Sequence, residues 1–154
     1  IACVEGAQIA TTSGTAKDFD LPSWATNCVL SLTTVSVDSA NQILVRLKDA
    51  GGAENTGYTS GRCYIDTVVT TTNSTDGFYL TGNVSAAVAI TGSIHLTRKN
   101  NSTNTWTARW IIHRSDSPEV IFGCGNKDLS AVLTGISLLS AGTFDAGSAN
   151  INYW

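Results

Sequence analysis

The sequence predicts an all-β protein built from about eight to ten short antiparallel strands, arranged as a sandwich or a barrel. Three observations lead to this class. Apolar and polar residues alternate over most of the chain, turn-forming residues interrupt the alternation at regular intervals, and no stretch has the period of a long helix. Only 14% of the 154 residues are charged. Thr, Ser, Asn and Gly replace them, and the first three compete with helical hydrogen bonds.

The first long strand is expected to contain a β-bulge. Leu30 and Leu32 share one parity, Val35 and Val37 share the other, and Thr33-Thr34 lies between the two pairs. One extra residue in a strand reverses the alternation of its side chains. A bulge at Thr33-Thr34 would therefore place all four apolar side chains on the same face of the sheet.

Later segments alternate without interruption, which predicts one face toward a core and one toward solvent. In residues 105–110 the apolar positions are Trp106, Ala108 and Trp110, so both indole rings are expected in the core. Residues 99–103 precede this segment and are typical of a hairpin loop. The same alternation occurs in residues 43–48, 93–97 and 135–139.

Residues 51–76 form the longest stretch without a clear period. They favour one strand over residues 62–70 and a long loop around Gly57-Tyr58-Thr59. We expect the whole chain, residues 1–154, to form one domain, because it contains no repeat, linker or low-complexity block. The chain has no Met, even at position 1, and we expect it to be the C-terminal part of a longer protein.

Charge and hydropathy disfavour two classes of partner. The net charge is −3, and the densest basic stretch is Arg98-Lys99, so nucleic acid phosphates have little to bind. No apolar run reaches the length of about 18 residues that a membrane-spanning helix needs. We expect neither nucleic-acid binding nor membrane insertion.

Four cysteines, Cys3, Cys28, Cys63 and Cys124, are candidates for disulfide bonds. None belongs to a Cys-x-x-Cys pair, so their spacing does not favour a zinc site. The sequence does not choose among the pairings that four cysteines allow. The alternative is that all four are free thiols that pack as small apolar residues.

No set of residues indicates catalysis, a metal or a cofactor. His95 and His113 are the two histidines, and neither is accompanied by the strand-turn-helix motif that presents a nucleophilic Ser. The acidic residues fall mostly in turns, which accounts for them without paired-carboxylate chemistry. We therefore expect a protein that is not an enzyme and has no catalytic residues, metal or cofactor.

Exposed aromatic rings next to polar side chains are the remaining candidates for ligand binding. Tyr58 lies among Gly, Thr and Ser and is the first candidate, with Asn55 beside it. Tyr79 is a weaker candidate of the same kind. The alternative for Tyr58 is packing within its own loop.

Several segments resemble a domain common among tailed-bacteriophage virion proteins. Residues 11–22 (TTSGTAKDFDLP) resemble its "TSGT" hairpin and "dFxxLP" segment, and residues 57–60 (GYTS) its "sGYtS" loop. Residues 92–98 (GSIHLTR) with Thr105-Trp106 are similar to its tryptophan hairpin. Residues 142–153 (GTFDAGSANINY) are similar to the "gtFDaGxxnixY" segment on which such chains end. The resemblance covers residues 8–154, and the four cysteines and the terminal Trp depart from it.

The resemblance implies a jelly-roll-like β-sandwich at the surface of a virion, in a tail fibre or spike tip or in a head-decoration or head-fibre protein. It implies host attachment or structural contacts, with other virion proteins or a host surface glycan as partners, and we expect a homotrimer. It implies no cofactor and no chemistry. The alternative outside virions is a carbohydrate-binding module appended to an enzyme.

Overall fold

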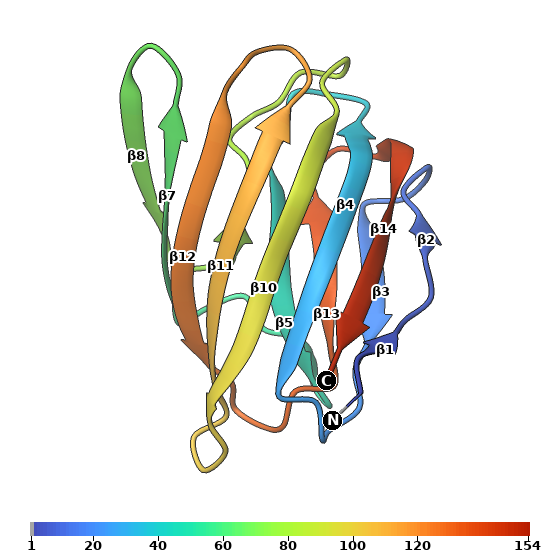
Figure 1. The fold of residues 1–154 in the computed structure, drawn as a ribbon, viewed down its shortest axis with the longest axis vertical. Coiled ribbons are helices and arrows are strands. Elements are labelled where there is room, and N and C mark those ends of the chain that lie inside the picture. The colour runs from blue at the N-terminus through green and yellow to red at the C-terminus, as the bar shows by residue number, and fades with distance from the viewer. Residues whose placement is uncertain (1) are drawn as a thin grey trace.

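The fold is a sandwich of two antiparallel β-sheets, as the sequence predicts. The computed structural model describes residues 2–154, and Figure 1 shows the larger sheet in front of the smaller one. The strands are β1 (Val4–Glu5), β2 (Ile9–Ala10), β3 (Ala16–Asp20), β4 (Asn27–Val37), β5 (Ile43–Asp49), β6 (Gly52–Ala53), β7 (Tyr58–Ile65), β8 (Val69–Ser74), β9 (Phe78–Tyr79), β10 (Ile90–Asn100), β11 (Thr105–Arg114), β12 (Val120–Asp128), β13 (Gly135–Ser140) and β14 (Phe144–Tyr153).

The larger sheet has nine strands in the order β1-β14-β4-β10-β11-β12-β7-β8, with β2 also pairing with β14. The smaller sheet has five strands in the order β3-β13-β5-β6, with β9 also pairing with β5. Neighbours in these orders are often far apart in the sequence, which is the topology of a jelly-roll-like sandwich rather than a meander. Four of the strands have only two residues, and the other ten match the number expected.

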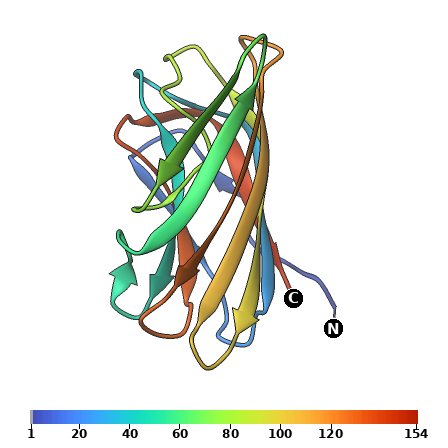
Figure 2. The same ribbon diagram turned by 90° about the vertical axis from the view of Figure 1, so that its left-hand side faces the viewer.

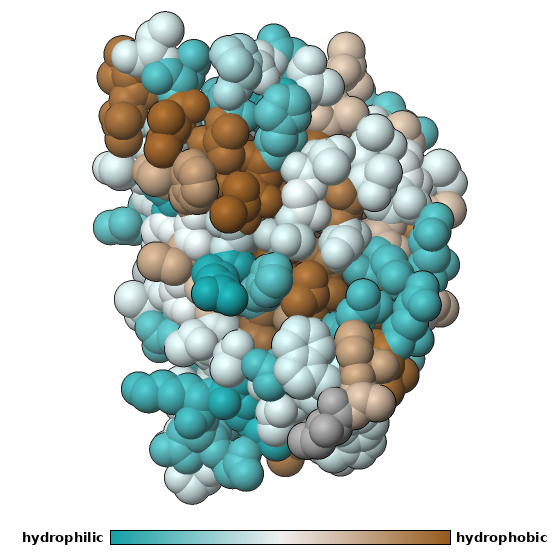
Figure 3. Space-filling model, viewed as in Figure 1, coloured by the Kyte–Doolittle hydropathy of each residue, from teal (hydrophilic) through white to brown (hydrophobic). Residues whose placement is uncertain are grey.

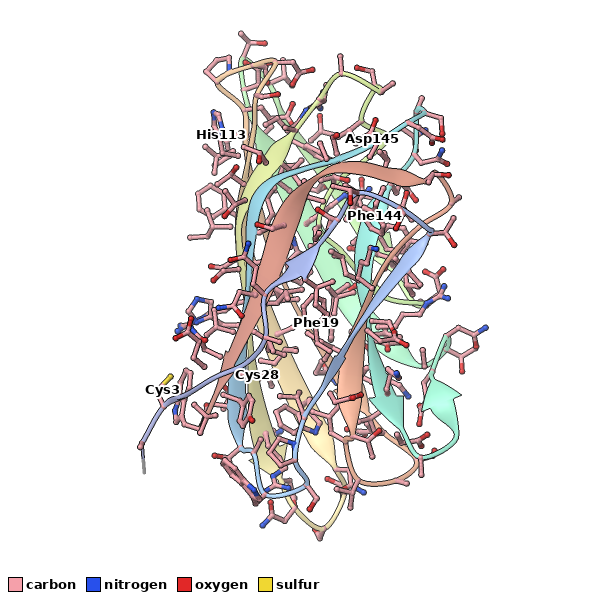
Figure 4. All side chains as sticks on the ribbon, turned by 90° about the vertical axis from the view of Figure 1, so that its right-hand side faces the viewer. Cys3, Phe19, Cys28, His113, Phe144 and Asp145 are labelled. Atoms are coloured by element: carbon pink, nitrogen blue, oxygen red, sulfur yellow. The ribbon has the colours of Figure 1, made fainter. Side chains whose placement is uncertain are left out.

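The two sheets face each other (Figure 2), and the side chains of the core fill the space between them. Trp106 and Trp110 are buried on the inner face of β11, as predicted. Phe19 from β3 and Phe144 from β14 belong to the same buried cluster and are labelled in Figure 4. Fully burying a large apolar side chain stabilises a fold by about 1.5–3 kcal/mol, so this cluster is the main source of stability.

The predicted bulge lies where the sequence places it. Along β4 and β10, Val35 pairs with Ile90 and Leu32 with Gly92, so Thr33-Thr34 is opposite a single residue. Thr34 has a positive φ of 50°. Leu30, Leu32, Val35 and Val37 are consequently all buried, on one face of the sheet.

Hydrogen bonds join residues 11–22 to residues 142–153. The Thr11 hydroxyl donates to the Ala146 carbonyl at 2.8 Å, and the Phe144 amide donates to the Gly14 carbonyl at 2.8 Å. Gly147 has a φ of 89°, and a Cβ there would lie 2.4 Å from the Thr34 carbonyl oxygen. Only glycine fits this close approach of β14 to the bulge of β4.

Residues 57–76 differ from the expectation of one strand and a long loop. They form a hairpin in which β7 begins at Tyr58 and β8 runs to Ser74. The inward positions of β7 hold mainly polar residues, so no apolar alternation marks the strand in the sequence. Residues 101–104, by contrast, form the turn between β10 and β11, close to the predicted hairpin loop.

Candidate functional site

The outer face of the larger sheet carries a groove. Its volume is about 750 Å³, and it crosses strands β8, β7, β12, β11 and β10. The smaller sheet lies behind the larger one (Figure 1), and the groove is on the other face of the larger sheet, which leaves it open to solvent. The side chains lining it come from outward positions. In one row across the strands Cys63 faces Phe122 and Phe122 faces Ile111, and in the neighbouring row Asn73 faces Gly61 and His95 faces Arg109.

An apolar strip lies at one end of this groove. We define it as Ile65, Val68, Val69, Ile111 and Phe122, whose exposed fractions range from 37% to 70%. In register, Ile65 pairs with Val69, and Phe122 with Ile111. Figure 3 shows apolar residues gathered over the upper ends of β8, β7, β12 and β11. An apolar patch that spans four adjacent strands is typical of an interaction surface.

The middle of the groove is polar and positively charged. His95 and Arg109 pair across β10 and β11, and Cys124 pairs with Arg109 on the other side. Partial burial, together with the charge of Arg109, lowers the pKa of His95. His95 is therefore neutral at neutral pH, and Arg109 carries the positive charge of this part of the groove.

The structure contains all four cysteines as free thiols, so none of the candidate disulfides is formed. Cys63 pairs with Phe122 and Cys124 with Gly61, which puts the two thiols on one face in diagonal positions. Diagonal neighbours are about 7–8 Å apart, beyond the usual span of a disulfide. Cys3 and Cys28 lie on opposite sides of β14 (Figure 4). Burial raises the pKa of the Cys28 thiol to about 12.

The expectation that Tyr58 presents an exposed ring is wrong. Its side chain is 2% exposed and packs against Phe78 with ring centroids 5.0 Å apart. Its hydroxyl accepts a hydrogen bond from the Leu47 amide at 2.8 Å and donates one to the Glu54 carbonyl at 3.0 Å. Burial raises the pKa of the Tyr58 phenol to about 12. Tyr58 is inward because it starts strand β7 instead of lying in a loop.

The two other predicted ligand-binding residues are not brought together. Asn55 is exposed in the connection between β6 and β7. Tyr79 is half-buried on β9, where its hydroxyl donates to Asp76 at 2.9 Å, and it lines a second, smaller cleft of about 290 Å³. Burial, reinforced by Asp76, raises the pKa of the Tyr79 phenol.

The strip residues Ile111 and Phe122 were missed by sequence reasoning, although a signal exists. Both interrupt the alternation of apolar and polar residues, since Ile111 stands between Trp110 and Ile112 and Phe122 follows Val120 and Ile121. An apolar residue at an outward position of a half-covered sheet indicates a surface that contacts something.

Within residues 2–154, no group of three His, Cys, Asp or Glu side chains is placed to hold a metal ion. His113 is exposed on β11, and its neighbour Arg114 is held by Asp116 at 2.8 Å. The described part of the chain also has no helix long and apolar enough to cross a membrane.

Comparisons with known proteins give no family. No protein-family model matches the chain, and no curated protein matches it. Among solved structures, it is similar to the marine PL-14 alginate lyase from Aplysia kurodai, with a TM-score of 0.37 and 7% identity over 95% of this chain and 80% of the lyase. This likeness is too distant to carry a functional conclusion.

Proposed function

We propose that this chain is a surface module of a tailed-bacteriophage particle, at a fibre or spike tip or as a decoration protein of the head, and that it works by making contacts. The observation that carries the proposal is the apolar strip on the uncovered face of the larger sheet. The phage-like segments support it as well, because the first and last of them are joined by the hydrogen bonds that Thr11 and Phe144 make.

The partner that fits the strip best is another copy of this chain. The strip continues to β8, the edge strand of the larger sheet, which has a partner on only one side within residues 2–154. Natural edge strands are usually protected by Lys, Pro or a bulge. Strand β8 (VTTTNS) has no charged residue and no Pro, and it pairs with β7 without a register shift. A second copy placed there would cover both the open edge and the apolar side chains.

Light scattering after size exclusion tests this proposal. We expect the wild-type chain to form an oligomer, a trimer being the expected state, and the variant Ile111→Lys/Phe122→Lys to have the monomer mass of 16.1 kDa. Two lysines would have to be desolvated in the contact, which is costly without partners. Val132→Lys is the matched control, because Val132 is 44% exposed but lies outside the strip.

A wild-type chain that remains monomeric at high concentration would contradict the proposed contact between copies. An oligomer that survives the double substitution would also contradict it. Imaging of the intact particle then tests the wider proposal, since the domain should be found at the virion surface.

The second candidate function is a carbohydrate-binding module appended to an enzyme. The observation that favours it is that the Phe122 ring lines the same groove as the polar side chains of His95, Arg109 and Asn73. A flat ring surrounded by polar groups is a common way to bind a sugar. A glycan array distinguishes the two functions: binding by wild type that is lost in Phe122→Ala, by a chain that stays monomeric, would favour the module.

A further inference from the structure

The smaller cleft lies at the opposite side of β7 from the groove, between the β7–β8 hairpin and β9. Its lining is rich in hydroxyl and amide groups, contributed by Thr72, Ser74, Thr75 and Gln42. Arg62 and Asp76 are the charged residues that line it. Figure 2 views the molecule from the side on which this hairpin lies.

Arg62 is a buried cation that the fold holds in a fixed orientation. The residue is only 7% exposed. Its Nε donates a hydrogen bond to the Tyr64 hydroxyl at 2.6 Å, and its guanidinium carbon lies 5.5 Å from the centre of the Tyr64 ring and 5.4 Å from that of Tyr79. Two aromatic rings and one hydrogen bond keep the planar group in place.

Arg62 has no carboxylate partner among residues 2–154. Asp76, the acid of the cleft, pairs with Arg46 at 3.4 Å and accepts the hydrogen bond from Tyr79. The terminal nitrogens of Arg62 make no hydrogen bond within the described chain. They are not among its buried polar atoms that lack a partner, so solvent can reach them. Buried charges are ordinarily paired, so a guanidinium left open at a cleft is an unusual arrangement.

The local charge favours an anion. Two guanidinium groups, Arg46 and Arg62, stand against the one carboxylate of Asp76. This excess of positive charge occurs in a chain whose net charge is −3. A guanidinium fork fits the two oxygens of a carboxylate or sulfate group, and its hydrogen bonds to an anion are among the strong ones in proteins.

We propose that this cleft binds a single acidic sugar unit, with its carboxylate or sulfate group on Arg62 and its hydroxyl groups on the Thr and Ser side chains. The volume of about 290 Å³ is just below the usual range for small-molecule sites, which suits one sugar ring. The site is separate from the apolar strip and does not depend on how copies of the chain assemble.

Titration calorimetry with three matched sugars tests the site. Galacturonate carries a carboxylate, galactose 6-sulfate carries a sulfate, and galactose carries neither. We expect one or both of the acidic sugars to bind at least ~10-fold more tightly than galactose, as a charge-assisted hydrogen bond from Arg62 implies. The acidic sugar that binds more tightly shows whether the site prefers a carboxylate or a sulfate. Equal affinity for all three sugars would overturn the proposal.

Two substitutions place the anion. Arg62→Gln should lower the affinity for the acidic sugar by about tenfold or more, whereas Arg109→Gln, which removes a charge from the groove on the outer face, should leave it unchanged. Asp76→Asn should raise the affinity, because it removes the competing carboxylate and keeps Arg62. Circular dichroism verifies that each variant is folded.

Asp76→Asn keeps the test decisive if Arg62→Gln fails to fold. Tighter binding in Asp76→Asn supports an anion on Arg62, and unchanged or weaker binding overturns it. Amide chemical shifts give the location: on addition of the acidic sugar they should move in residues 62 and 72–76. Shifts confined to the outer face would contradict this site.

Discussion

The inward faces of β11 and β7 belong to the same sheet but carry different chemistry. Strand β11 turns Trp106, Ala108, Trp110 and Ile112 toward the smaller sheet, and all four are buried. Strand β7 instead turns inward the hydroxyl of Ser60 and the guanidinium of Arg62, between two tyrosines. The difference follows from position in the sheet, because β11 lies near its centre and β7 is second from the edge.

The polar groups on the inner face of β7 are tolerated because most of them have partners. The Ser60 hydroxyl donates to the Gly77 carbonyl at 3.0 Å, and Tyr58 uses its hydroxyl twice. The terminal nitrogens of Arg62 stand apart in having none within residues 2–154. Coverage by a second layer therefore sets which side chains a strand turns inward, and β7, the less covered of these two strands, is where a ligand can reach a charged group.

Trp110→Ala is the substitution with the largest expected effect. It measures how much the apolar inner face of β11 contributes to stability. The indole packs over Gly123, where a Cβ would lie 2.0 Å from the ring, and against Phe78 with centroids 6.0 Å apart. Removing it leaves a cavity, so the free energy of unfolding should fall by about 3–5 kcal/mol. Urea denaturation measures the change.

The control for Trp110→Ala is Trp24→Ala, since Trp24 is 54% exposed. Its loss should cost much less than that of Trp110. Similar costs for the two tryptophans would mean that the centre of the larger sheet is not closed by the smaller one.

Tyr58→Phe tests the hydrogen bonds made by a polar group on the inner face of β7, and its effect on stability should be smaller. It keeps the ring packed on Phe78 but leaves the buried Leu47 amide without its acceptor. An unpaired buried donor costs about 1–3 kcal/mol, so we expect a decrease in unfolding free energy of that size. Tyr153→Phe is the control, because the Tyr153 hydroxyl makes no hydrogen bond within the described chain, and it should be close to neutral. An equal decrease in unfolding free energy for Tyr58→Phe and Tyr153→Phe would show that the hydrogen bonds of the Tyr58 hydroxyl do not stabilise the fold.

Acid should weaken the same region through Glu54, an effect expected to be smaller still. Burial acts to raise the pKa of Glu54, but hydrogen bonds from Lys127 and Ser130 outweigh it and lower the pKa below its usual 4.5. A carboxylate with a lowered pKa in the folded state adds stability above its unfolded pKa, and this stability is lost as the pH falls through the folded value.

The measurement is the midpoint of thermal unfolding between pH 7 and pH 2. Wild type should lose stability below about pH 4.5, in the window set by the unfolded and folded pKa values of Glu54. Glu54→Gln should be less stable than wild type at pH 7 and should lose less on acidification. A parallel decline of both proteins would show that other carboxylates, such as Asp18, account for the acid sensitivity.

The sequence predicts the fold best where the inward positions are apolar. The bulge at Thr33-Thr34 follows from a change of parity, and the burial of Trp106 and Trp110 follows from plain alternation. Both signals are local, so neither needs knowledge of the partner sheet.

The hairpin of β7 and β8 could not be predicted in the same way. Ser60 and Arg62 occupy inward positions, so the apolar period that would mark a strand is absent and Tyr58 looks like a loop residue. The smaller cleft is harder still to predict from the sequence, because one of its residues, Tyr79, comes from β9 in the other sheet. Contacts between distant segments decide such a site, and no local pattern contains them.

The pairing of β1 with β14 has a mechanical consequence. Val4 lies opposite Tyr153 and Glu5 opposite Asn152, so both ends of the chain leave the molecule at the same pole (Figure 1). A pulling force applied to the two ends would break the hydrogen bonds between β1 and β14 one after another, in the unzipping geometry. It would not load them all at once, as the shear geometry does. The domain should therefore peel apart at low force when pulled by both ends, whereas a tether attached through one end alone would leave the whole sandwich unloaded.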